Sequence, residues 1–286
     1  MSPTTQRLQR LIISISWGWA LLLVLAPLLY VLVVSFMQKG AYGGIEMPLG
    51  LQAYRQMLDP LLRTSLLDTL LRSLLLALTT TLGCLVLALP LVLYLVLKAR
   101  RLRTFLFFLL IIPFWTNFLI RTYAWQVILS DQGWLNHLLT QLHLPTVAWL
   151  FTGKALVLGM LYNYLPFMAM SLYVSMEKID PLLLDAARDL GANRMQRLTK
   201  VILPLLKPGI VNGCTMVFIP ALGEFVIPDI LGGGTKVYLG NYPAQQFLVV
   251  RNWPYGAALS MVLLIMIVAT MWLTRHWRSK DQEVLS

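Results

Sequence analysis

Long apolar stretches alternate with short polar segments along this chain of 286 residues. A helix needs about 20 apolar residues to cross a bilayer, and several stretches reach that length. They are continuous rather than alternating, which argues against a transmembrane β-barrel. We therefore expect an all-α polytopic membrane protein with six transmembrane helices. The predicted spans cover residues 11–36, 70–97, 105–129, 154–176, 206–228 and 255–274.

The spans form one predicted transmembrane domain, residues 11–274, between two short terminal segments, 1–10 and 275–286. The first span is too long for a signal-peptide core and lacks a clear small-residue cleavage site, so we expect it to be retained. Between the fourth and fifth spans lies a charged loop at 177–205. The composition is 58% hydrophobic and 12% charged, and a soluble domain of this size is rarely so apolar, because it needs polar surface.

The basic residues predict the orientation of the chain in the membrane. Fifteen of the 23 Lys and Arg residues lie in the segments that the spans place on the side of the N-terminus. Positive charge marks the cytoplasmic side, so both termini and the loop at 177–205 are expected in the cytoplasm. The net charge of +11 is therefore mainly a topology signal, and we expect no nucleic-acid partner.

The sequence contains no pattern that is typical of a catalytic site. Cys84 and Cys214 both lie in apolar stretches, where cysteine behaves as a small hydrophobic residue rather than a disulfide or metal ligand. No nucleophile–base or metal-ligand cluster stands out, so we predict no catalytic residue and no metal site. There is no Walker-type nucleotide-binding loop. We expect a non-catalytic membrane subunit that binds no cofactor itself.

The charged loop contains the stretch "DAARDLGANRMQRLTKVILP", residues 185–204. Asp180 before Pro181 is typical of a helix start, and Gly191 suits the left-handed residue that ends a helix. The predicted helix over 181–190 is about 15 Å long, too short to cross a membrane.

A second helix follows in the same loop. Asn193 can cap it, and it should run toward Leu203, with Pro204 and Pro208 breaking the path before the fifth span. It carries a basic stripe at a spacing of three residues, Arg194, Arg197 and Lys200. Contact with anionic lipid headgroups is one explanation of this stripe.

The stretch resembles the EAA loop of bacterial ABC importer permeases: Glu-Ala-Ala, three residues, Gly, then an apolar stretch ending in Leu-Pro. The matching residues are Ala186, Ala187, Gly191, Ile202, Leu203 and Pro204, with Asp185 in place of Glu. The resemblance implies a MetI-like architecture in which this short helix docks in a groove of a cytoplasmic ATPase. The implied coupling residues are Asp185, Ala186, Ala187, Asp189, Leu190 and Gly191.

Three further segments resemble spermidine/putrescine importer permeases: "PFWTNFLIRTYAW" (113–125), "GEFVIPDILGG" (223–233) and "NWPYGAALS" (252–260). This resemblance covers nearly the whole chain from about residue 10. It implies a polyamine permease of the bacterial inner membrane. Its implied partners are a second homologous permease, forming a heterodimer, two ATPase subunits that bind ATP and Mg, and an extracytoplasmic polyamine-binding protein.

Polar residues within spans are candidates for the substrate pathway, because they are costly in a bilayer. Asn117, Arg121 and Trp125 recur every four residues and predict one stripe, which packing against other helices also explains. Glu224 is the only acid well inside an apolar stretch; it either pairs with Arg121 or faces a cavity shared with it. A polycation needs carboxylates and aromatic faces. The candidates are Glu224, Asp229, Trp115, Asn117, Arg121, Tyr123, Trp125, Tyr162 and Tyr164.

Other functions stay open at this point. In an ABC permease for an anion or an opine-like solute, Arg121 would contact the ligand and Glu224 would be its structural partner. In a secondary transporter, the intramembrane acid would carry a coupling proton. The coupling-loop motif disfavours that alternative, and a membrane enzyme is disfavoured further still.

Overall fold

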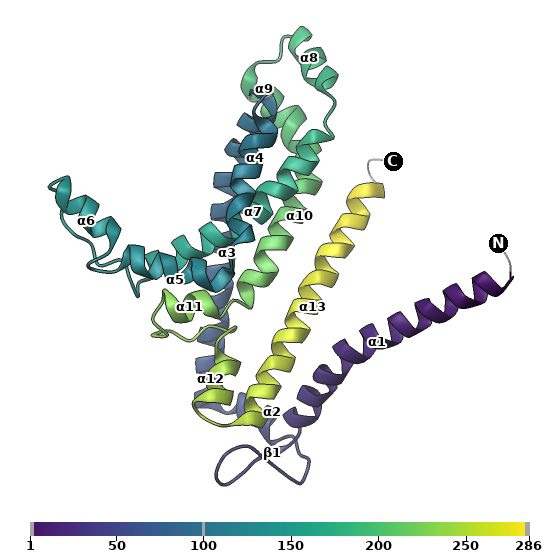
Figure 1. Cartoon of the computed structure of the whole chain (residues 1–286), viewed down its shortest axis with the longest axis vertical. Helices are drawn as coiled ribbons and strands as arrows, with labels where there is room; N and C mark the ends of the chain where they lie inside the picture. Colours follow the sequence, from purple (N-terminus) through teal and green to yellow (C-terminus); the bar gives the residue numbers. More distant parts are fainter. Residues whose placement is uncertain (1–2, 99–100, 284–286) are drawn as a thin grey trace. The chain divides into compact units, whose positions relative to one another are not determined.

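The computed structural model describes residues 3–98 and 101–283, and almost all of them lie in helices or short connections. Five helices within this part of the chain are long and apolar enough to cross a membrane. They are Ile13–Ser35, Leu62–Leu97, Gly153–Glu177, Arg194–Leu222 and Trp253–Trp272. A bent pair, Arg103–Trp115 with Phe118–Gln141, supplies a sixth crossing if it counts as one span. The predicted all-α polytopic fold is confirmed (Figure 1).

The chain divides into two compact units, and the first comprises residues up to 66 together with 242–265. Its elements are α1 (Pro3–Ser35), β1 (Gln38–Lys39), β2 (Ile45–Glu46), α2 (Gln52–Leu58), α12 (Tyr242–Leu248) and the first part of α13 (Trp253–Glu283). β1 and β2 pair antiparallel, with Gln38 opposite Glu46. The Ser35 hydroxyl lies 2.8 Å from that of Tyr54, which ties α1 to α2.

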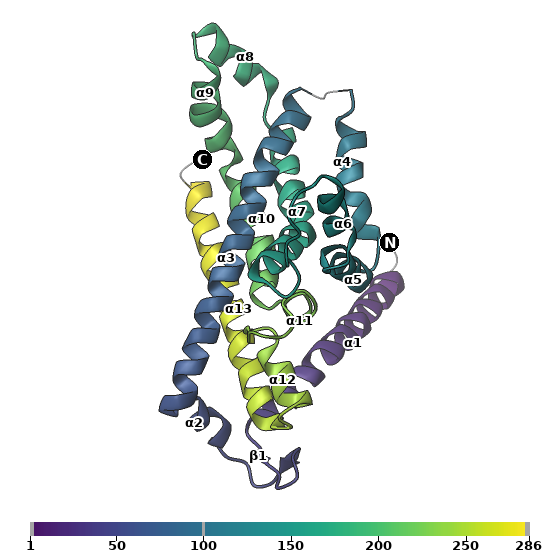
Figure 2. The same cartoon turned by 90° about the vertical axis from the view of Figure 1, so that its left-hand side faces the viewer.

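The second unit holds residues 67–241 and those from 266 onward. Its elements are most of α3 (Pro60–Leu97), α4 (Arg103–Ile111), η1 (Ile112–Trp115), α5 (Phe118–Leu129), α6 (Trp134–Gln141), α7 (Gly153–Glu177), α8 (Pro181–Asp189), α9 (Arg194–Arg197), η2 (Leu198–Ile202), α10 (Leu203–Leu222), α11 (Val226–Ile230) and the end of α13. Figure 2 shows α7 and α10 side by side, with α8 and α9 at one end of the unit.

The contact between α7 and α10 is the most extensive one in this unit, and small residues allow the two helices to approach each other. Gly209 and Gly213 are buried and lie four residues apart on one face of α10. The Ser171 hydroxyl on α7 donates to the Gly209 carbonyl at 2.9 Å, and the Asn212 amide donates to Ser171 at 3.1 Å. Small residues and interhelical hydrogen bonds hold membrane helices together in this way. The spacing of these glycines is visible in the sequence as "GIVNG".

The predicted third span, 105–129, is not one straight helix. The path bends by 94° between Trp115 and Phe118. Pro113 lacks an amide donor and favours a break. Asn117 has an extended backbone, and its side chain accepts from the amides of Leu119 and Ile120. Asn117 is therefore the cap of α5, so the predicted stripe of three residues is reduced to Arg121 and Trp125.

The expected break at Pro204 and Pro208 is also wrong, because the helical path continues from Arg194 to Leu222. A π-helical turn, η2, precedes Pro204, and the Leu203 amide reaches back to the Leu198 carbonyl. This wider turn changes the hydrogen-bond register just where proline cannot donate. At its far end α10 stops at Leu222, so the last residues of the predicted fifth span lie outside it.

The ends of the chain also differ from the predicted segments. α1 begins at Pro3, so the segment 1–10 is largely the start of the first helix. α13 continues to Glu283, beyond the predicted limit at 274. Arg100, which contributed to the predicted orientation, and residues 284–286 lie outside the described residues.

Candidate functional site

Two breaks in the helical path lie against α7. The first separates η1 from α5 at residues 116–117, and the second separates α10 from α11 at 223–225. Both α5 and α11 pack on α7. At membrane depth, irregular backbone is tolerated only where it is buried in protein or lines a cavity. Two such breaks against one helix therefore mark the candidate transport site.

Glu224 lies in the second break rather than inside a helix. One carboxylate oxygen accepts the hydroxyl hydrogen of Tyr164 on α7 at 2.6 Å. The other accepts from the backbone amides of Phe225, Val226 and Ile227, at 3.1, 3.0 and 3.4 Å. The Tyr164 side chain is 7% exposed. The carboxylate is thus fixed in position by the turn that follows it and by α7.

Arg121 turns back toward the bend of its own span. Its Nη1 donates to the Pro113 carbonyl at 2.7 Å, and its Cζ lies 5.0 Å from the centre of the Phe114 ring. Its Nε is buried without a hydrogen-bond partner. The described side chains of Arg121 and Glu224 form no ion pair with each other, so one of the two arrangements predicted for them is not adopted.

Three aromatic rings connect these two charged residues. The Tyr164 and Phe167 rings on α7 are 6.2 Å apart, and Phe167 meets Phe114 of η1 edge-on at 4.7 Å. The series Glu224, Tyr164, Phe167, Phe114 and Arg121, here called the ring ladder, joins the two breaks. Phe114 and Phe167 were not among the predicted site residues. Phenylalanines within apolar stretches carry no polar signal, and only the adjacent Pro113 and Pro166 hint at their position.

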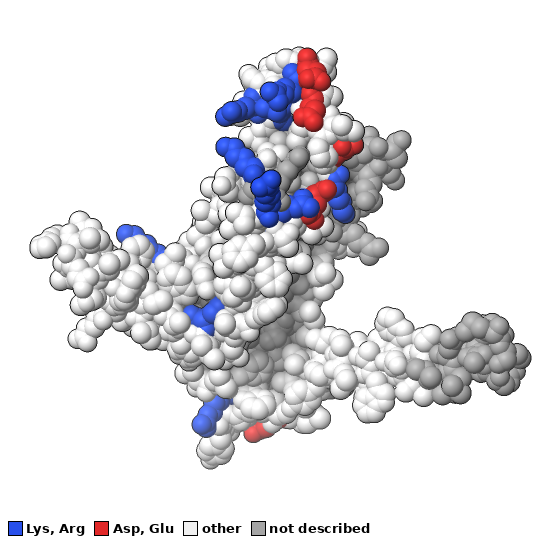
Figure 3. Space-filling model, turned by 45° about the horizontal axis from the view of Figure 1, so that its top comes forward, with Lys and Arg blue, Asp and Glu red and all other residues white. Residues whose placement is uncertain are grey.

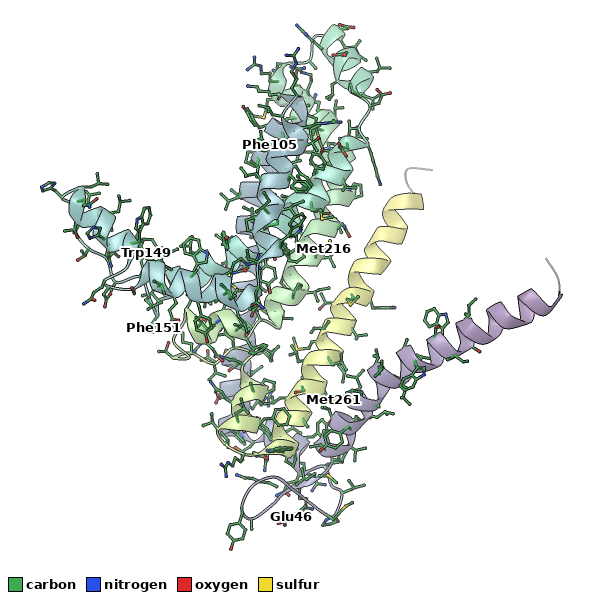
Figure 4. The ribbon with its side chains drawn as sticks, viewed as in Figure 1. Glu46, Phe105, Trp149, Phe151, Met216 and Met261 are labelled. Atoms are coloured by element: carbon green, nitrogen blue, oxygen red, sulfur yellow. The ribbon has the colours of Figure 1, made fainter. Side chains whose placement is uncertain are left out.

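The other aromatic candidates divide into two groups. Trp125 of α5 and Tyr162 of α7 meet at 5.2 Å, so the structure brings this pair together. Trp115 is 75% exposed and contacts Phe108 at 5.6 Å, and Tyr123 is also exposed. Figure 4 shows the side chains of this region, with Phe105 on α4 and Met216 on α10 labelled.

Asp229, the second acid candidate, anchors a loop. It accepts from the Asn241 side-chain amide at 2.8 Å, and Asn241 is fully buried. The Asn241 side-chain oxygen accepts from the Tyr238 amide at 2.7 Å, and the Ser73 hydroxyl oxygen accepts from the Leu239 amide at 2.7 Å. These bonds hold the glycine-rich loop after α11 in place, which gives Asp229 a structural task.

At the α8 end of the unit, the predicted local structure is confirmed. The Asp180 side chain accepts from the Leu182 amide at 2.9 Å, and Gly191 has φ of +78°. Asn193 forms a capping box with Gln196. Leu182 on α8 and Leu190, the residue that follows α8, are 71% and 89% exposed, so apolar side chains are exposed at this end. Figure 3 shows Lys and Arg side chains gathered at this end, with Asp and Glu beside them.

Residues 47–280 match the family model described as binding-protein-dependent transport system inner membrane component. The chain belongs to this family. The permease is 42% identical to the spermidine/putrescine transport system permease protein PotB of Salmonella typhimurium over 277 residues, 96% of this chain and 94% of that protein. PotB of Escherichia coli K12 is also 42% identical, over 92% of this chain and 94% of its own.

Solved structures share the fold of this permease. A bacterial ABC transporter that imports the acidic polysaccharide alginate matches with a TM-score of 0.73 and 16% identity, over 96% of each chain. The inward-facing methionine ABC transporter MetNI matches with a TM-score of 0.53 and 18% identity, over 80% of this chain and 99% of that one. The predicted MetI-like permease architecture is thus confirmed, and the permease is a multi-pass protein of the bacterial inner membrane.

The ring ladder gives this permease one chemical capability in particular. A carboxylate fixed beside aromatic faces can hold an ammonium group by charge-assisted hydrogen bonding and cation–π contact. The Arg121 guanidinium already lies over Phe114, so the far end of the ladder is occupied by a cation of the protein. At the other end, the Glu224 carboxylate accepts from the Tyr164 hydroxyl and from the backbone amides that follow it.

Proposed function

We propose that this permease is the membrane subunit of an ATP-driven importer of polyamines, spermidine and/or putrescine. The observation that carries the proposal is the 42% identity to PotB permeases over nearly the full length of both chains. The chemistry of the ring ladder supports it. A polyamine is a flexible polycation, and a fixed carboxylate with adjacent aromatic rings suits one of its ammonium groups.

The same proposal covers the orientation and the partners. Both termini and α8 face the cytoplasm, as the distribution of basic residues favours. Two ATPase subunits bind and hydrolyse ATP with Mg, a second homologous permease completes the pathway, and an extracytoplasmic binding protein delivers the substrate. This chain takes no part in ATP hydrolysis. Closure of the ATPases moves α8, and the spans open alternately to either side.

The surface of α8 supports its assignment as the ATPase contact. Its capped ends fix a short helix, and the exposed Leu182 and Leu190 leave apolar area uncovered. Such area is stabilised when a partner protein covers it. The coupling residues predicted from the sequence, Asp185, Ala186, Ala187, Asp189, Leu190 and Gly191, all lie on this helix or in the turn that ends it.

Reconstitution of the whole complex tests the substrate. We expect the loaded polyamine-binding protein to stimulate ATP hydrolysis severalfold and to support uptake of labelled spermidine or putrescine into proteoliposomes. A panel of anions and opines should give neither response. Stimulation by one of those solutes would support the alternative substrate class, and uptake that proceeds without ATP would support a secondary transporter.

Gly191→Val should weaken the association with the ATPase roughly tenfold while the permease still inserts in the membrane. Gly191 has φ of +78°, which costs a side chain about 1–2 kcal/mol, and more when it is β-branched. The measurement is co-purification of the ATPase with the membrane subunits. Gly191→Asn should be nearly normal, because asparagine tolerates this backbone region.

Gly44→Val provides the matched control for this substitution. Gly44 also has positive φ, +82°, and a Cβ there would meet nothing within 4 Å, as at Gly191. It lies in the first unit, away from α8 in sequence. Normal co-purification of the ATPase with Gly191→Val, together with normal uptake, would remove this turn from the docking surface.

A further inference from the structure

A small polar cluster lies where α7 leads into α8. Glu177 is the last residue of α7, and α8 begins at Pro181. The Glu177 carboxylate accepts the Tyr173 hydroxyl hydrogen at 2.8 Å and lies 3.6 Å from a guanidinium nitrogen of Arg103. Arg103 is the first residue of α4. The cluster therefore joins the start of α4 to the end of α7.

A stacked pair of rings reinforces this junction. Phe107, four residues after Arg103, stacks on Tyr173 with 4.0 Å between ring centres and 18° between ring planes. Tyr173 thus contacts α4 through its ring and Glu177 through its hydroxyl. α4 meets α7 a second time beyond its other end, where Phe114 of η1 packs edge-on against Phe167 at 4.7 Å.

These contacts tie α4 and the following η1 to α7 at two places. The nine residues of α4 form a helix about 14 Å long, with the Glu177 cluster at its start and η1 directly after its end. Phe114 of η1 is a member of the ring ladder. α4 therefore runs from the Glu177 cluster to the first helix break.

We propose that Glu177 is a positioning residue that couples the movement of α8 to the ring ladder. The inference rests on the proposed function, because it takes α8 to be the part that the ATPase moves. When α8 shifts, the link at 178–180 moves Glu177, and Glu177 carries Arg103 and α4 with it. Because Phe114 also packs on Phe167 of α7, this part of α7 moves together with α4 and η1, and the Arg121 end of the ring ladder shifts relative to Glu224.

The Arg103–Glu177 ion pair is exposed to solvent, so its role in coupling can be tested separately from any role in folding stability. The side chains of Arg103 and Glu177 are 43% and 39% exposed. Exposed ion pairs contribute little to folding, so substitution of either residue should leave the permease folded. An ion pair with little effect on folding stability can still guide the movement of α4. The Arg103–Glu177 pair is the charged contact of the cluster that connects α4 with α7.

The test uses Glu177→Gln in the reconstituted complex with its ATPase, partner permease and binding protein. Glutamine keeps an oxygen for the Tyr173 hydroxyl but loses the charge toward Arg103. We expect normal co-purification of the ATPase and a fall of about two- to fivefold in polyamine transported per ATP hydrolysed, the scale of one exposed ion pair. The charge-exchanged double variant, Arg103→Glu with Glu177→Arg, should recover most of the wild-type ratio.

Arg72→Gln is the matched control, because it removes another exposed ion pair of the same unit, Arg72 with Asp68. Its transport per ATP should stay at the wild-type value. A wild-type ratio in an assembled Glu177→Gln complex, or no recovery in the charge-exchanged variant, would overturn the inference. Failure of the unaltered complex to bind ATPase or to import polyamines would instead contradict the proposed function.

Discussion

Gly209→Leu should abolish the normal packing of α7 against α10 and sharply reduce the yield of folded permease. A Cβ at Gly209 would overlap the Cβ and Oγ of Ser175 and would approach the Ser171 carbonyl to 3.3 Å. Ser171 also donates to the Gly209 carbonyl. Overpacking a close contact costs about 1–3 kcal/mol or more, and loss of this hydrogen bond adds about 1 kcal/mol. Thermal stability of the detergent-solubilised permease measures the effect.

Two variants make this expectation specific. Gly18→Leu lies on α1, where a Cβ would meet nothing within 4 Å, and it should leave the thermal stability unchanged. Gly209→Ala should be milder than leucine, and a second substitution, Ser175→Gly, should restore much of its stability by removing the overlapping Cβ. A wild-type melting temperature for Gly209→Leu would show that close packing of α7 against α10 at Gly209 does not contribute to the stability of the permease.

Local features of the fold were predictable because short-range chemistry determines them. Asp180 and Asn193 cap helices by accepting from backbone amides two or three residues away, and Gly191 adopts the left-handed conformation that ends α8. These roles depend only on neighbouring residues and can be predicted from the local sequence. Most long spans were predictable as well, because bilayer thickness sets the length of an apolar helix.

The helix breaks depend on more than local sequence. The break predicted at Pro204 and Pro208 is absent, whereas the break beside Pro113, within the predicted third span, was not predicted. In a membrane helix, neighbouring helices and π-helical turns can satisfy the backbone groups that proline leaves free. Whether a proline interrupts a helix therefore depends on tertiary packing, which the positions of the prolines in the sequence do not reveal.

The candidate site was predictable in composition but not in arrangement. Glu224 and Arg121 stood out because charge is rare in apolar stretches. Their partners, Tyr164 and Pro113, could not be chosen from the sequence, because Tyr164 is 60 residues from Glu224 and the Pro113 bond depends on a 94° bend. Phe114 and Phe167 look like any other apolar residue until α7 places them between the two charges.

Glu224→Gln should lower polyamine uptake by roughly tenfold or more in a complex that assembles normally. Glutamine keeps the shape of the side chain and an oxygen for the amides of Val226 and Ile227, but it removes the charge that an ammonium group would meet. Loss of one charge-assisted contact costs about 1.5–3 kcal/mol, which corresponds to this factor. Uptake into proteoliposomes gives the measurement, and the binding protein's own affinity should not change.

Further variants separate substrate contact from structural support at Glu224. Tyr164→Phe removes the hydroxyl that donates to Glu224 but keeps the ring, so it should reduce uptake less than Glu224→Gln. Because the structure pairs Arg121 with the Pro113 carbonyl, adding Arg121→Gln to Glu224→Gln should restore nothing. Recovery of assembly and uptake in that double variant would instead indicate a charge pair that forms during transport. Wild-type uptake by an assembled Glu224→Gln complex would exclude Glu224 from both roles, and the ladder would then need another group to hold the substrate cation.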